Sequence, residues 1–234
     1  MYLKTPDGSI VDKDGRVVFF SCERFVRDIC EGDSCFICGA SRSTKPFNDE
    51  HVLPEWVLRR YGLLSRRVNL PNGTSFRYDQ YTVPCCVDCN TLMGRQIETP
   101  VSELIGKGAD AVNQHLESRG SLLFFVWLGL IFLKTHLKDR QLRFNRDQRK
   151  PDDPISALYT WETLHHIHTV ARCFYTGCRI SANVFGSFLA LPLSWCANPV
   201  PTGPARGAKG YLTQSIYREV IKVIVPGDNH DNFP

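Results

Sequence analysis

The sequence lacks long hydrophobic runs, internal repeats and low-complexity tracts. Its longest apolar run, Leu122 to Leu133, covers about a dozen residues and ends at Lys134, whereas a membrane-spanning helix needs roughly twenty residues. We therefore expect a buried helix here and no membrane partner. The first residues, Met1 to Gly8, also lack the apolar segment of a secretory signal, which favours the cytoplasm.

A strong net charge is absent as well. The chain of 234 residues carries a formal charge of +4, which permits an anionic partner but does not require one. With 43% hydrophobic and 22% charged residues, the composition is typical of a globular protein and excludes an intrinsically disordered chain. This length can bury a proper core, as one large domain or two small ones.

Cysteine, by contrast, is abundant, with ten residues in the chain. Two Cys-x-x-Cys pairs, Cys35/Cys38 and Cys86/Cys89, favour a zinc site in a reducing compartment over a disulfide framework. Four thiolates from two such pairs can complete the tetrahedron around one zinc ion. Because Cys85 adjoins Cys86, only the Cys-x-x-Cys spacing favours Cys86, and either thiolate could be the ligand.

Two further features accompany the cysteine pairs. Glu50-His51 lies between the pairs, and Asn90 directly follows the second one. A neutral histidine can take a proton from water, and carboxylate and amide oxygens suit a hard divalent cation. Each residue alone has an ordinary surface explanation. Their position inside a two-pair frame is what points to phosphodiester cleavage.

These motifs together carry a resemblance to a known family. Cys35-x-x-Cys38, Glu50-His51-Val52-Leu53-Pro54 and Cys86-x-x-Cys89-Asn90 resemble the HNH endonuclease family in its zinc-containing ββα-metal form. The similarity covers roughly residues 35–98. It implies an α+β fold in which residues 1–118 form the nuclease domain, with a ββα-metal core and a structural zinc. His51 would end the first strand of that core as the general base.

The same resemblance implies a second, catalytic metal ion, Mg²⁺ or Mn²⁺. Glu50 would match the acidic ligand that precedes the base, and Asn90 would match the ligand that opens the final helix. The family often has a further histidine or asparagine on that helix, and no histidine follows here. Glu98, two helical turns beyond Asn90, could replace it on the same face.

Basic residues near the proposed site point to DNA as the partner. Phosphate neutralisation by arginine gives sequence-independent, salt-sensitive affinity. A solvated helix face and a basic turn would explain the same residues without DNA. A second basic run, from Lys134 to Lys150, could extend the footprint or form the outer face of a helix and its loop. The expected DNA-binding residues are Arg59, Arg60, Arg66, Arg67, Arg77 and Arg95.

Local patterns predict the elements that carry these motifs. Asn72-Gly73 predicts a turn before strand-forming sequence, and Pro54 with Gly62 marks the two ends of a short helix. Thr99-Pro100 should end one helix and start another, with Thr99 as its N-cap. Other expected elements are strands over 17–20 and 75–83 and helices over 23–30 and 90–98.

The chain from about residue 121 onward has a different pattern. Helices are expected from 122 to about 142 and from 155 to about 174. Strand-forming sequence follows at 181–193 and 211–225, on either side of a loop over 199–210. We assign residues 119–234 to a mainly helical region with some strand, for DNA specificity or for docking a protein partner or a second copy.

Taken together, these features predict a metal-dependent endonuclease that hydrolyses DNA and leaves a 5′-phosphate and a 3′-hydroxyl. Phage defence or a mobile element would fit such a chain. Two alternatives stay open. One is a zinc-stabilised nucleic-acid-binding module without catalysis, and the other is a nuclease subunit that is active only within a larger complex.

Overall fold

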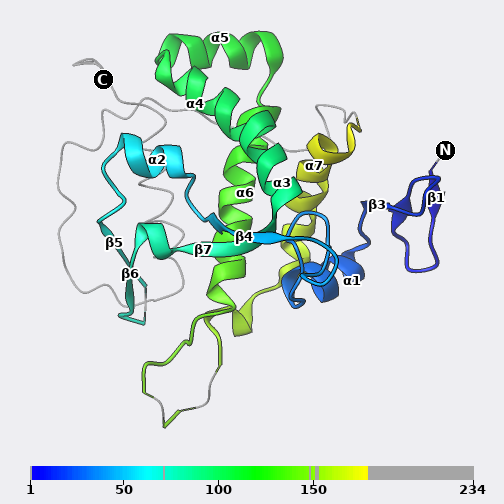
Figure 1. The fold of residues 1–234 in the computed structure, drawn as a ribbon, viewed down its shortest axis with the longest axis horizontal. Helices are drawn as coiled ribbons and strands as arrows, with labels where there is room; N and C mark the ends of the chain where they lie inside the picture. The colour runs from blue at the N-terminus through cyan, green and yellow to red at the C-terminus, as the bar shows by residue number, and fades with distance from the viewer. Residues whose placement is uncertain (1, 71, 148, 151–152, 179–234) are drawn as a thin grey trace, which may run out of the picture.

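The structure is a computed structural model that describes residues 2–70, 72–147, 149–150 and 153–178. These residues form a mixed α+β fold, as expected, with three small antiparallel sheets and one long central helix (Figure 1). The strand-forming segments expected after residue 180 lie outside the described residues.

The N-terminal segment is a small sheet followed by a short helix. Strands β1 (Leu3–Lys4), β2 (Ile10–Val11) and β3 (Val17–Phe19) pair in that order. Helix α1 (Cys22–Arg24) continues into a wider turn, η1 (Phe25–Cys30). Ser21 caps α1, because its side chain accepts a hydrogen bond from the Arg24 amide. The expected strand over 17–20 and helix over 23–30 are thus confirmed to within a residue or two.

The centre of the motif region is an antiparallel strand pair that runs into a helix. Strand β4 (Phe47–His51) pairs with β7 (Thr82–Cys86), so that Phe47 lies opposite Cys86 and His51 opposite Thr82. Helix α3 (Val87–Met93) begins at the residue after β7. The Val87 amide donates to the Pro46 carbonyl at 3.0 Å, which joins the start of the helix to the start of β4.

The chain between the two paired strands forms a helix and a hairpin. Helix α2 (Glu55–Arg60) agrees with the short helix expected from Pro54 to just before Gly62. Strands β5 (Arg67–Asn69) and β6 (Ser75–Arg77) pair around the expected turn, in which Gly73 has φ +77°. The strand expected over 75–83 is interrupted by a 3₁₀ turn, η2 (Tyr78–Gln80), that separates β6 from β7.

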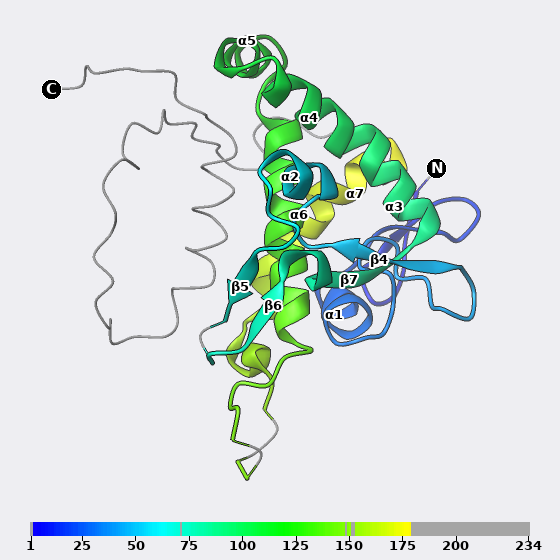
Figure 2. The ribbon, with the colours of Figure 1, turned by 60° about the vertical axis from the view of Figure 1, so that its left-hand side comes forward.

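Helix α3 does not stop at Thr99-Pro100. It continues through the wider turn η3 (Gly94–Glu98) into α4 (Thr99–Gly106) (Figure 2). Thr99 has helical φ and ψ of −60° and −51°, and its amide donates to the Gly94 carbonyl, so it is not an N-cap. The prediction was wrong because the wide turn absorbs Pro100 at the start of α4, where its missing N–H costs little. Helix α5 (Ala109–Arg119) follows.

Helix α6 (Leu122–Asp139) is the buried helix expected from the apolar run. It stands at the centre of the molecule, and both β7 and helix α7 (His165–Thr176) pack against it (Figures 1 and 2). A Cβ on Gly129 would lie 2.8 Å from Cγ2 of Ile167, so glycine permits this close approach of α7 to α6. The expected helix over 155–174 begins with two 3₁₀ turns, η4 (Ile155–Leu158) and η5 (Trp161–Leu164).

One hydrophobic cluster joins these elements. It extends from Phe20 to Ala171 and takes side chains from α6 and α7 as well as from the strands. A functional division at residues 118/119 stays a prediction, but α6 and α7 share their core with the residues before it. Within the described chain, no single helix is long and apolar enough to cross a membrane, although α5 and α6, bent by 110°, pass that test as a pair.

Candidate metal centre and neighbouring acidic site

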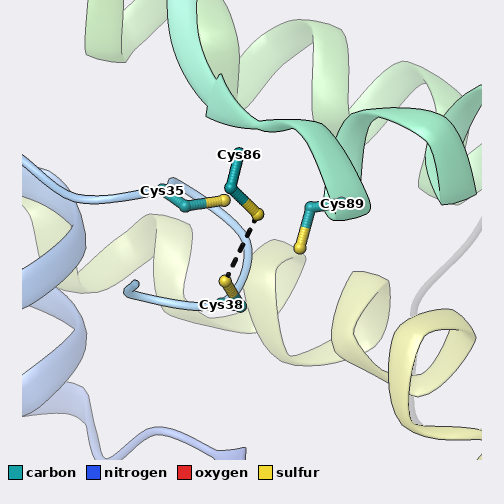
Figure 3. Close-up of side chains that lie close together, drawn as sticks. All are labelled: Cys35, Cys38, Cys86 and Cys89. Atoms are coloured by element: carbon teal, nitrogen blue, oxygen red, sulfur yellow. Dashed lines mark hydrogen bonds between the residues drawn. The ribbon is translucent and has the colours of Figure 1, made fainter. Parts of the chain in front are cut away.

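Four cysteine sulfurs converge where β7 meets α3. Cys35 and Cys38 come from the loop before β4, Cys86 ends β7, and Cys89 lies in the first turn of α3 (Figure 3). Their sulfur atoms all lie within 4.8 Å of one another, and Cys38 Sγ is 3.7 Å from Cys86 Sγ. Tetrahedral zinc with Zn–S bonds of about 2.3 Å requires sulfurs about 3.8 Å apart. The four cysteines could therefore hold a structural metal ion such as zinc.

The loop that carries Cys35 and Cys38 turns tightly at Gly39. The Gly39 amide donates to the Cys35 carbonyl at 2.8 Å, and the Cys35 amide donates to the Ala40 carbonyl at 2.8 Å. Gly39 has φ +71°, and a Cβ there would lie 2.9 Å from Cζ of Phe20. Only glycine meets both conditions without strain, so this residue sets the spacing at which the two thiols face the same point.

Cys86, rather than Cys85, completes the group of four sulfurs. Successive residues of a strand point to opposite faces, so only one of these neighbours can face the centre of the group. Cys85 is also fully buried, and its sulfur lies 3.8 Å from Cys35 Sγ. Cys85 therefore contacts Cys35 directly but lies outside the group of four sulfurs.

Mutual contact makes the thiols compete for a single negative charge. Hydrogen bonds from Cys38, Cys85 and Cys89 hold the pKa of Cys35 far below its usual range. The bond to Cys35 in turn raises the pKa of Cys38 to about 12, and contact with Cys35 raises the pKa of Cys85 and Cys89 strongly. A bound dication removes this competition, because it stabilises every ligating thiolate.

Helix α7 hydrogen-bonds to the cysteine loop and to β3. The His168 ring is fully buried, and its Nε2 lies 3.1 Å from the Ile37 carbonyl, between the two cysteines of the first pair. Burial lowers the pKa of His168 to about 3, so the ring is neutral and Nε2 donates. One turn later, Arg172 donates to the Val18 carbonyl at 3.1 Å and to the Val17 carbonyl. From the sequence neither residue was assigned a role, because their partners lie 131 and 154 residues away in the chain.

His51 lies at the end of β4, half-buried, opposite Thr82. Among the described residues, no side chain or carbonyl hydrogen-bonds to its ring. Its backbone carbonyl is held by Lys134 Nζ at 2.8 Å. The backbone of His51 is therefore held in place while its imidazole makes no hydrogen bond to the described residues, which is compatible with the predicted general base.

Asn90 lies in the first turn of α3, as predicted for the residue that opens the helix. Its Nδ2 donates to Asn48 Oδ1 at 3.0 Å. Asn48 and Glu50 share one face of β4, whereas His51 projects from the other face. Within the part of the chain that the structure describes, no hydrogen bond connects His51 with Asn90 or with the Glu50 carboxylate.

Glu50 and Glu98 do converge, but around a cation that belongs to the protein. Lys134, on α6, has a side chain only 1% exposed, and its Nζ donates to Glu50 Oε1 at 2.7 Å. Glu98 Oε1 lies 4.0 Å from the same nitrogen and has no hydrogen-bond partner. Burial raises the pKa of Glu98 to about 7, against the opposing influence of Lys134.

The predicted catalytic-metal ligands thus do not fit a divalent ion in the geometry observed. The ammonium of Lys134 lies against the Glu50 carboxylate, where the ion would have to bind. For the described residues, the four cysteines are the one group of histidine, cysteine and acidic side chains close enough to hold a metal. The sequence placed Lys134 at the start of a basic run that was expected either to bind DNA or to form an exposed helix face. Its burial agrees with neither expectation.

All six expected DNA-binding arginines are exposed. Four are engaged with neighbours: Arg59 with Glu55, Arg60 over the Trp56 ring, Arg67 with Ser75 and Arg77 with Asp79. The guanidinium groups of Arg66 and Arg95 have no described partner. In the second basic run, Arg140 donates to the Cys30 and Gly32 carbonyls, so it holds a loop.

No family model, curated protein or solved structure matches this chain. The relation to the HNH endonucleases therefore stays a prediction from the motifs.

Proposed function

We propose that this protein is a zinc-stabilised endonuclease of the HNH type that hydrolyses DNA phosphodiester bonds. One observation carries the proposal: the antiparallel β4–β7 pair runs directly into α3, with His51 at the end of β4 and Asn90 in the first turn of α3. The four cysteines bring the loop before β4 against the junction of β7 and α3. This is the arrangement that the resemblance predicts for a ββα-metal core.

In the proposed reaction, His51 acts as the general base. Its uncommitted ring takes a proton from a water molecule, and the oxygen of that water attacks the phosphorus. The bond from phosphorus to the 3′ oxygen breaks, and that oxygen takes up a proton, which leaves a 5′-phosphate and a 3′-hydroxyl. Arg66 and Arg95, whose guanidinium groups have no described partner, neutralise phosphates of the bound DNA.

A divalent ion at Glu50, Asn90 and Glu98 is not used in this scheme. The carboxylate of Glu50 is paired with Lys134 in a buried position, and separating such a pair costs several kcal/mol. Dependence on Mg²⁺ or Mn²⁺ is therefore a separate prediction, which the cleavage assay tests by its metal requirement.

The buried ion pair also favours a second candidate function. A zinc-stabilised module that binds nucleic acid without cleaving it needs the cysteine centre and the exposed arginines, but no open acidic site. Neutralisation of Glu50 by Lys134 is compatible with that role. The same assay separates the two candidates.

The experiment incubates the purified protein with supercoiled plasmid, with Mg²⁺, with Mn²⁺ or with a chelator, and compares His51→Ala with wild type. His166→Ala is the matched control, since His166 is an exposed histidine on α7. Nicking or linearisation should be lost in His51→Ala, retained in His166→Ala, and DNA binding should be unchanged in both.

Cleavage that persists in His51→Ala would reject the assignment of the base. Wild-type protein that binds the plasmid but leaves it intact with every metal would instead support the binding module.

A further inference from the structure

We infer that Lys134 is the built-in cation of the acidic site formed by β4, η3 and α6, and that its ammonium excludes a divalent metal ion from Glu50 and Glu98. The inference concerns the site of the proposed nuclease and deepens that proposal. Its test measures metal binding, so it does not depend on cleavage.

Three oxygen atoms surround the Lys134 nitrogen. Glu50 Oε1 lies at 2.7 Å, the His51 carbonyl oxygen at 2.8 Å and Glu98 Oε1 at 4.0 Å. Carboxylates and backbone carbonyls are the ligands that hard divalent cations take. The donor set is therefore that of a metal site, but an ammonium on a helix from a distant part of the sequence fills its centre.

The ammonium and a divalent ion cannot share this position. Both are cations, and both would have to share the Glu50 carboxylate, one oxygen of which already accepts from Lys134. At such separations, inside a protein, like charges repel by several kcal/mol. Binding of an ion at Glu50 thus requires the ammonium to leave.

Lys134 has little freedom to leave. Its side chain is 1% exposed, and its neighbours on α6, Leu133 and Thr135, are buried as well. An ammonium moved from this site into apolar surroundings would lose both hydrogen bonds, and an unpaired buried charge is strongly unfavourable. The exclusion is therefore a lasting property of the fold.

Removal of the ammonium alone should convert the site. Lys134→Ala leaves two buried carboxylates and a carbonyl around a space without a cation, and a divalent ion can then satisfy them. We expect Lys134→Ala to gain one Mn²⁺ per chain with at least about tenfold higher affinity than wild type at this site, because the repulsion between like charges is removed. The gain should disappear in Lys134→Ala/Glu50→Gln.

The measurement is titration of the zinc-loaded, full-length protein with Mn²⁺, followed by electron paramagnetic resonance of the free ion. Lys138→Ala is the matched control, because Lys138 lies one turn later on α6, and its ammonium contacts Gln141. It should gain no Mn²⁺ site. Far-ultraviolet circular dichroism and zinc content establish that each variant is folded.

Wild-type protein offers an independent test if Lys134→Ala does not fold. Glu50→Gln in the wild-type background should leave Mn²⁺ binding unchanged. Mn²⁺ bound tightly by wild type and lost in Glu50→Gln would overturn the inference, and so would a folded Lys134→Ala protein that gains no site. A gain of the site in a protein that never cleaves DNA would support the inference while removing the proposed function.

Discussion

The cysteine centre, at the junction of β7 and α3, and the acidic site, between β4, η3 and α6, pose a similar electrostatic problem. Each gathers several groups that are negative when ionised, and each needs a positive charge among them. The four sulfurs have no ammonium or guanidinium hydrogen-bonded to them among the described residues, whereas Glu50 and Glu98 enclose Lys134. The cysteine centre, where the chain supplies no cation of its own, could hold a metal ion, whereas our inference is that Lys134 excludes one from the acidic site.

The largest effect is expected from the cysteine centre. Cys86→Ser should abolish zinc binding and unfold the β7–α3 junction, because structural zinc contributes about 10–16 kcal/mol of apparent binding free energy. Cys85→Ser is the control, since Cys85 lies outside the group of four, and it should keep one zinc per chain. Zinc content and thermal unfolding measure both variants.

Equal zinc content in Cys86→Ser and wild type, with loss in Cys85→Ser, would reverse the choice between these neighbours.

An intermediate effect is expected from Lys134→Met, which removes the ammonium but keeps most of the apolar stem. The variant leaves Glu50 buried without a partner, so the free energy of unfolding should fall by about 3–5 kcal/mol. Lys134→Met/Glu50→Gln should recover a large part of this loss, because it also removes the unpaired charge. Urea denaturation of the zinc-loaded proteins measures the effect, and equal losses in the single and double variants would contradict it.

The smallest effect concerns the second carboxylate. Burial raises the pKa of Glu98 from 4.5 to about 7, so the folded protein favours the protonated form. The stability that this group contributes is present below pH 4.5 and is lost as the pH rises through about 7. The change amounts to roughly 3 kcal/mol at about 1.4 kcal/mol per pKa unit.

Glu98→Gln should therefore remove the loss of stability between pH 4.5 and 7 and should be more stable than wild type at pH 8. Glu103→Gln, at an exposed glutamate of α4, is the control and should keep the wild-type pH profile. Urea denaturation at fixed zinc concentration across this range measures the effect. If Glu98→Gln kept the wild-type pH profile, Glu98 would not be the group whose buried charge lowers the stability above pH 4.5.

The sequence predicted well those features that depend on short spacings. Two residues between paired cysteines, Pro54 and Gly62 around a helix, and Asn72-Gly73 at a turn are all local, and the structure has each of them. The predicted stop at Thr99-Pro100 was wrong because the wide turn η3 precedes Pro100 and places it at the start of α4, where proline is tolerated. The helix predicted from residue 155 likewise begins only at His165, because two 3₁₀ turns precede α7.

The sequence by itself predicted the four cysteines that could hold a metal ion, apart from the choice between Cys85 and Cys86, because the spacing within each pair is a property of a few adjacent residues. Only the tertiary structure decided that the carboxylates of Glu50 and Glu98 lie beside a buried ammonium, that of Lys134. Lys134 is 84 residues from Glu50 in the chain, and its role depends on how α6 packs against β4 and η3. A lysine in a basic run reads as exposed, and only the surrounding core shows that its charge is buried and already paired.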